Sequence, residues 1–170
     1  LLAEGRTTDE VYRQTATAES RNALFFCGHT AYTDAFTSHF LEHLPSGASV
    51  VSRGEQTLGY SWRKANPAVR SFLLGWALGE ALCEWGVTID HIYGLGVGAL
   101  IAQCARKERS WHDGLSQSID LDASTVHHAQ QQKDLHALCS KMASDGVEIL
   151  IGTQIEGLAA CRAVLSKRAN

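Results

Sequence analysis

Three short apolar runs, separated by segments with helical spacing, constrain the fold of this chain more than any other feature. The runs cover residues 23–27, 88–93 and 147–151. Their length and their aromatic and β-branched content favour buried strands. Because helical segments lie between them, we expect parallel strands with helices on both faces. The sequence therefore predicts an α/β fold, a three-layer α/β/α arrangement around a short, mostly parallel sheet.

The longest expected helix begins at Asn66 and Pro67 and stops at Gly86. Asn66 can cap the helix, and proline suits its first turn. Glycine after the last apolar residue is typical of a helix end. The segment 46–64 holds three glycines, and we expect it to be a loop containing a strand at 48–52. Further helices are predicted over residues 32–43, 99–106, 128–143 and 155–167, with one helical turn at 113–115.

The length of 170 residues suits one domain, which we place at residues 21–168 after a linker or N-terminal helix at 1–20. Leu1 is not an initiator methionine, so we expect a piece of a longer chain. The net charge of -3 argues against nucleic acid and anionic membranes as partners. Because the first residues are polar and the longest apolar run holds Gly75, Gly79 and Glu80, we expect neither a signal peptide nor a membrane span.

The five cysteines are widely spaced, with no CxxC pair, so we expect neither a metal site nor a cofactor. Four of them have apolar neighbours and are predicted to be buried, reduced thiols, as in a cytoplasmic protein: Cys27, Cys83, Cys104 and Cys139.

A glycine-rich turn, Gly94-Leu95-Gly96-Val97-Gly98, joins the second expected strand to the helix after it. A nucleophile elbow has the pattern G-x-S-x-G at such a place. Here Gly96 stands at the serine position, and it can adopt strained dihedrals but cannot attack a substrate. Two other interpretations stay open. The turn could be a phosphate-binding loop, although it lacks the third glycine of the G-x-G-x-x-G pattern. It could also be only a close-packed connection between a strand and a helix.

Residues 66–115 resemble the segment around the GHSxG motif in malonyl-CoA:acyl carrier protein transacylases and polyketide synthase acyltransferases. The likeness covers the helix start at Asn66-Pro67, the Trp85-Gly86-Val87 element, the strand, the turn and residues 111–115. Residues 24–29 are similar to the first strand and its F-x-G-Q-G loop in that family. Residues 135–158 are similar to its late dG-x-x-x-F-L-E-I-G-P segment.

Against the family pattern, the chain departs at each functional position. Gly96 replaces the serine, Leu95 the preceding histidine and Ala99 the following glutamate. His29 and Thr30 stand where the oxyanion loop has glutamine and glycine. Where the resemblance implies an arginine that clamps a carboxylate, the chain has Asp120, Leu121 and Asp122. No H-S-x-x-M stretch supplies the catalytic histidine. Little sequence remains for the ferredoxin-like subdomain, so the resemblance implies the large, hydrolase-like subdomain alone.

The resemblance therefore implies a shortened, noncatalytic acyltransferase-like domain of a polyketide synthase. It would have a structural or docking role beside a ketosynthase, a carrier protein or a separate acyltransferase. The alternative is a repurposed enzyme acting on a carrier-bound thioester, with Cys27 and His29 as candidate residues. Other polar residues that could take part in such chemistry are Asp90 and His91, next to the turn, and the pair His127 and His128. A third hypothesis is retained binding of CoA or a phosphopantetheine arm at the helix N-terminus.

The tryptophans bear on where a docking surface would lie. We expect Trp76 and Trp85 to pack in the core, whereas Trp62 falls in the irregular segment and could be either buried or an exposed docking contact.

Overall fold

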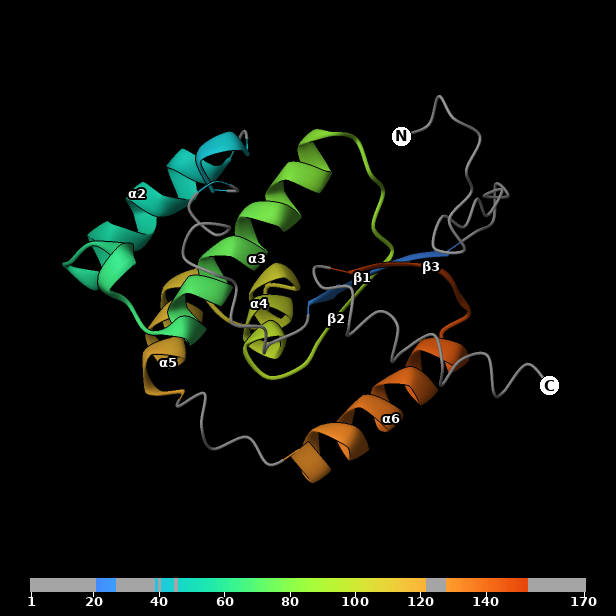
Figure 1. The fold of residues 1–170 in the computed structure, drawn as a ribbon. Helices are drawn as coiled ribbons and strands as arrows, with labels where there is room; N and C mark the ends of the chain where they lie inside the picture. Colours follow the sequence, from blue (N-terminus) through green and yellow to red (C-terminus); the bar gives the residue numbers. More distant parts are fainter. Residues whose placement is uncertain (1–20, 27–38, 40, 45, 122–127, 153–170) are drawn as a thin grey trace, which may run out of the picture.

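The computed structural model describes residues 21–26, 39, 41–44, 46–121 and 128–152 (Figure 1). The predicted helix at 155–167 and the segment 1–20 lie outside these residues. The described residues form an α/β fold with a small parallel sheet. Its strands are β1 (Arg21–Phe26), β2 (His91–Gly94) and β3 (Val147–Gly152), in the order β2-β1-β3, and both outer strands run parallel to β1.

Strand β2 begins three residues later than the sequence predicted. Side-chain hydrogen bonds, together with one backbone bond from the Asp90 N–H to the Asn22 carbonyl oxygen at 2.9 Å, hold the preceding residues. The Asn22 Nδ2 donates to the carbonyl oxygen of Thr88 at 3.0 Å, and the Asn22 N–H donates to Asp90 Oδ2 at 2.8 Å. These contacts position the chain beside β1 before regular pairing starts at His91.

The described helices are α2 (Gly47–Leu58), α3 (Pro67–Glu84), α4 (Val97–Ala105), α5 (Trp111–Asp120) and α6 (His128–Ser144), with a 3₁₀ turn, η1 (Trp62–Lys64). Residues 39 and 41–43 are also helical. The caps of α3 confirm the prediction: Asn66 Oδ1 accepts from the Val69 N–H at 2.8 Å, and Gly86 follows with φ +76°. At the start of α5, Ser110 Oγ accepts from the Asp113 N–H at 3.0 Å. The helix has 10 residues and begins at Trp111, before the helical turn that we expected to start at residue 113.

The strand predicted at 48–52 is wrong, because those residues belong to α2. Two of the three glycines that suggested a loop are sites of close packing, and the third, Gly59, is the C-cap residue of α2 with φ +73°. A Cβ on Gly54 would lie 2.8 Å from a methyl carbon of Leu73, and one on Gly47 would lie 1.8 Å from the Leu41 carbonyl oxygen. Val50 and Gly54 share the buried side of the helix, at helical spacing.

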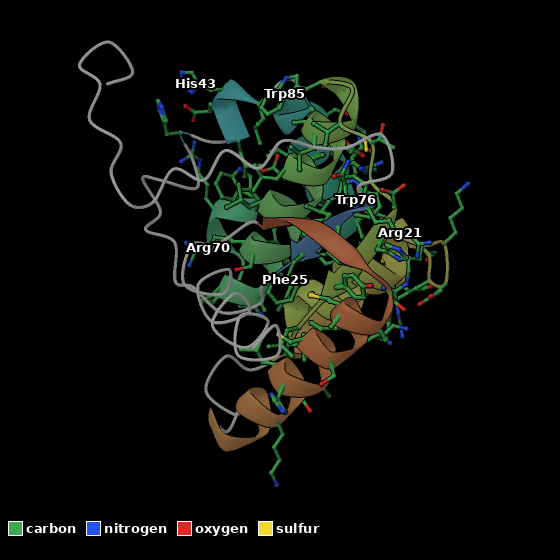
Figure 2. The ribbon with its side chains drawn as sticks, turned by 90° about the vertical axis from the view of Figure 1, so that its right-hand side faces the viewer. Arg21, Phe25, His43, Arg70, Trp76 and Trp85 are labelled. Carbon is green, nitrogen blue, oxygen red and sulfur yellow. The ribbon has the colours of Figure 1, made fainter. Side chains whose placement is uncertain are left out.

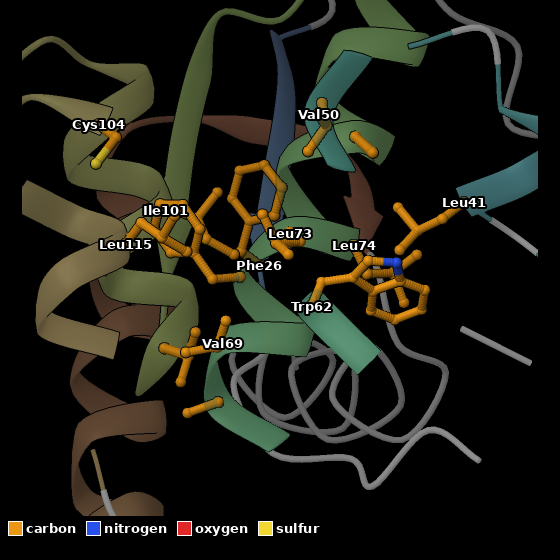
Figure 3. Close-up of a cluster of buried hydrophobic side chains, with 14 of the residues drawn as sticks. Phe26, Leu41, Val50, Trp62, Val69, Leu73, Leu74, Ile101, Cys104 and Leu115 are labelled. Carbon is orange, nitrogen blue, oxygen red and sulfur yellow. The ribbon is translucent and has the colours of Figure 1, made fainter. Parts of the chain in front are cut away.

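The core divides between the two faces of the sheet because successive side chains of β1 point in opposite directions. Leu24 and Phe26 pack with α2, α3, α4 and α5, and Figure 3 shows Phe26 among the side chains of these helices. Ala23 and Phe25 pack instead with Tyr93 and with the α6 side chains Cys139 and Met142. Figure 1 shows α6 apart from the group of helices α2 to α5.

The tryptophans differ from the expectation in one case. Trp76 is partly buried against the core, as predicted. Trp62 is only 5% exposed and closes the cluster in Figure 3, so it is no surface docking contact. Trp85 is 61% exposed, contrary to the prediction. It is the C-cap residue of α3, one position beyond the helix, and its side chain lies past the last core-facing turn.

Among the cysteines, Cys104 and Cys139 are buried as predicted, whereas Cys83 is exposed. Cys83 lies two positions after the buried Ala81, on the other side of α3. Burial raises the pKa of the Cys104 thiol, which keeps it protonated and unreactive. Cys27 and Cys161 lie outside the described residues. None of the helices in the described part of the chain is long and apolar enough to cross a membrane.

Candidate functional site

The glycine-rich turn has the backbone of a nucleophile elbow. Gly96 is the N-cap of α4, with φ +59° and ψ −128°. Side chains other than glycine avoid this region of backbone space, at a cost of about 1–3 kcal/mol. A sharp, strained residue between a strand and a helix is what the G-x-S-x-G elbow requires at its centre. Gly96 keeps that conformation without a hydroxyl group.

The two flanking glycines are required by packing. A Cβ on Gly94 would lie 1.9 Å from the carbonyl oxygen of Gly98, and a Cβ on Gly98 would lie 1.9 Å from the carbonyl oxygen of Phe26. These distances are far below any real contact, and both obstacles are backbone. The Leu95 N–H also donates to the Phe26 carbonyl oxygen at 3.0 Å. The turn therefore packs closely against both β1 and α4, which agrees with the interpretation that it is a close-packed connection between a strand and a helix.

The hydrogen bonds of the turn bear on the phosphate-loop interpretation. The Gly98 N–H donates to the Leu95 carbonyl, and the Ala99 N–H donates to the Gly96 carbonyl, both at 3.0 Å. Two N–H groups of the first helical turn are thus already satisfied within the protein. An anion at the N-terminus of α4 would find fewer donors than a phosphate loop provides.

Two cavities flank the turn between α4 and α6. The larger one, about 500 Å³, follows β2, and its described lining comprises Ile89, Asp90, His91, Ile92, Tyr93, Gly94, Ala99, Ala102, Gln103, Arg106, Glu108, Leu138, Lys141 and Asp145. The smaller one, about 410 Å³, lies at the turn, lined by Gly94, Leu95, Gly96, Ala99, Asp134, Ala137, Leu138 and Lys141. Neither described lining contains a serine, threonine or cysteine, so the hydroxyl group of Tyr93 is the one hydroxyl or thiol that the described residues contribute to these linings.

Arg106, in the larger cavity, has three of its N–H donors occupied. Its Nε and Nη2 atoms bond the two carboxylate oxygens of Glu108 at 2.7 and 2.8 Å, and Nη1 bonds the carbonyl oxygen of Ile92 at 2.7 Å. The hydrogen bond to Glu108 raises the pKa of Arg106, and the same contact lowers the pKa of Glu108. Because three of its donors are engaged, Arg106 is poorly suited to clamp the carboxylate of a substrate.

Tyr93 joins β2 to the end of α6. Its hydroxyl donates to Asp145 Oδ2 at 2.5 Å, and only 4% of the residue is exposed. Burial raises the pKa of Tyr93 well above its usual range, and the Asp145 carboxylate adds to this effect. The His91 ring stacks on Tyr93, with centroids 6.0 Å apart. At neutral pH Tyr93 is a protonated structural donor and not a general base.

The structure brings together the five residues of the degenerate elbow, 94–98, and places His91 beside them. Asp90 is bound to Asn22, as described above. Asp120 ends α5, and neither it nor Leu121 belongs to the described lining of the cavities. Cys27, His29, Thr30, Asp122 and His127 lie outside the described residues. His128 begins α6, in the part where only the backbone is described.

Four side chains that shape the larger cavity were missed in the sequence: Tyr93, Arg106, Lys141 and Asp145. The sequence could have indicated the ion pair between Arg106 and Glu108, because these opposite charges lie two residues apart at the end of a predicted helix. The contact between Tyr93 and Asp145 spans 52 positions and had no local signal.

Comparisons of the chain with protein-family models, with curated proteins and with solved structures found no match. In the described ranges, no group of three or more His, Cys, Asp or Glu side chains is arranged to hold a metal ion.

Proposed function

We propose that this chain is a noncatalytic acyltransferase-like domain of a cytoplasmic polyketide synthase, with a structural or docking role beside a ketosynthase, a carrier protein or a separate acyltransferase. One observation carries the proposal. Three glycines hold the backbone of a nucleophile elbow in place, while the central residue has no atom that could attack a thioester.

The chemistry of acyl transfer needs a nucleophile, a base and oxyanion donors acting together. Removing the serine of such a site alone costs a factor of about 10⁶ in turnover. Here the nearby polar groups are engaged elsewhere. Arg106 is bound by Glu108, and Tyr93 donates to Asp145. These contacts support a role in which the turn serves packing rather than catalysis.

The order of elements supports the acyltransferase likeness. A first strand is followed by helices, then by the elbow strand β2 and α4, and β3 comes last on the other side of β1. This order suits a three-layer α/β/α large subdomain. Only residues 121–127 connect α5 to α6. That connection is too short for a ferredoxin-like subdomain, which would form the second wall of an acyl pocket.

A binding experiment tests the docking role. The domain would be titrated against purified ketosynthase, acyltransferase and carrier-protein partners of a polyketide synthase in an interferometry or calorimetry assay. We expect saturable binding to at least one of them. Binding to none of the three, together with product formation from an acyl-CoA, would contradict the proposal.

A further inference from the structure

His39 and His43 form a close pair on the surface, remote from the glycine-rich turn in sequence. They are four residues apart in a helical segment, and their ring centroids are 4.1 Å apart with planes tilted by 34°. Both residues are exposed. Figure 2 shows His43 at the periphery of the molecule. Residues at this spacing lie one above the other on a helix, so both rings face the same side.

A hydrogen bond fixes which ring nitrogen of His43 is free. Its Nδ1 atom lies 2.7 Å from the carbonyl oxygen of His39. Since a carbonyl can only accept, Nδ1 carries the proton and donates it. In the neutral ring this leaves the lone pair on Nε2. Histidines that bind metals are generally oriented in this way, with one ring N–H donated to a carbonyl or carboxylate.

We propose that His39 and His43 together bind a divalent transition-metal ion, such as Ni²⁺, Zn²⁺ or Cu²⁺, through two ring nitrogens. Water would complete the coordination. Two nitrogens on one tetrahedral zinc ion, each at about 2.0–2.1 Å, lie roughly 3.3 Å apart. The two rings, with centroids 4.1 Å apart, already lie side by side, and binding would require them to turn so that one nitrogen of each points at the same ion. Imidazole ligands select these ions over Mg²⁺ and Ca²⁺, which prefer oxygen.

The neighbouring residues support the backbone of the histidine pair and do not compete for its ring nitrogens. Leu41 is 2% exposed and anchors the segment in the core, so the two rings stay on a supported backbone. The Glu42 carboxylate lies 3.0 Å from the Arg63 guanidinium, and is engaged there rather than at the histidines. The site is independent of any acyltransferase role.

Isothermal titration with NiCl₂ tests the proposal, with MgCl₂ as the control ion. Accessible thiols such as Cys83 would first be blocked with iodoacetamide. The variants are His39→Ala, His43→Ala and the swap Ser38→His with His39→Ser. The swap keeps the number of histidines and the backbone carbonyl bonded by His43, but it places the histidines five positions apart in the sequence, a spacing that does not put two side chains on one side of a helix.

We expect one Ni²⁺ ion per chain, bound at least about tenfold more tightly than by any of the three variants, because the second ligand binds intramolecularly. At about 1 mM Ni²⁺ the melting temperature of the parent chain should rise, and that of the swapped chain should rise less. Equal affinity in the parent and the swap would overturn the proposal. So would parent-like binding in both alanine variants, or no Ni²⁺ binding by the parent chain.

Discussion

Replacing Gly98 with alanine tests whether packing of the turn against the sheet explains its glycines. The new Cβ would lie 1.9 Å from the carbonyl oxygen of Phe26 and 2.5 Å from its carbonyl carbon. Real Cβ contacts are essentially never closer than 3.0 Å, so α4 and β1 must separate locally by about 1 Å or more. Overpacking of this kind costs about 1–3 kcal/mol and occasionally more. A backbone obstacle sets the cost at or above the top of that range.

Alanine also gains about 1 kcal/mol of helix propensity over glycine. The net loss in the free energy of unfolding for Gly98→Ala should therefore be at least about 2 kcal/mol, a large share of the roughly 5–15 kcal/mol of a typical domain. Urea denaturation followed by far-UV circular dichroism measures it, and the slope of the transition should not change.

The matched control is Gly79→Ala in α3, which faces the same phenylalanine. Its Cβ would lie 3.2 Å from Phe26 Cζ, so the obstacle is the end of a side chain rather than backbone, and the distance is only slightly short of an ordinary contact. We expect unchanged stability or a gain of up to about 1 kcal/mol from helix propensity. Wild-type stability in Gly98→Ala, or an equal loss in Gly79→Ala, would refute the packing argument.

Three further predictions concern side chains outside the glycine substitutions. Trp62→Ala should lower the free energy of unfolding by about 3–5 kcal/mol because it leaves a cavity in the core, whereas Trp85→Ala, at an exposed position, should change it by no more than about 0.5 kcal/mol. Urea denaturation of both variants measures the difference. Tyr93→Phe should lose about 1–3 kcal/mol because Asp145 loses its donor. As the folded-state pKa of Tyr93 is raised, the parent chain should lose stability as pH rises above about 10, and the variant should lose less. Asn66→Ala should lower the free energy of unfolding by about 1 kcal/mol, because α3 loses the side chain that caps its N-terminus, and thermal unfolding measures this change.

The sequence was sufficient for features governed by local rules. The cap at Asn66 and the stop at Gly86 depend on neighbouring residues, and both were predicted correctly. The strand–turn–helix around Gly96 was also predicted, because glycine spacing and apolar runs are local patterns.

Features that depend on tertiary packing were not predictable in this way. Gly54 reads as a loop residue until Leu73 is known to lie against it, and so α2 was mistaken for a strand and loop. Trp85 reads as a core residue because it continues an apolar helix, yet α3 ends one residue earlier. In the candidate site, the contact between Tyr93 and Asp145 forms only when β2 and the end of α6 meet.

The most direct test of the noncatalytic role is acyl loading followed by intact mass spectrometry. The chain would be incubated with malonyl-CoA and acetyl-CoA, with and without a carrier protein, beside an active acyltransferase as the positive control. Because Gly96 has no nucleophilic atom and no serine, threonine or cysteine belongs to the described lining of the cavities at the turn, we expect no added mass on the chain and no acyl group on the carrier. A stoichiometric acyl adduct on the chain, or transfer to the carrier protein, would contradict the account.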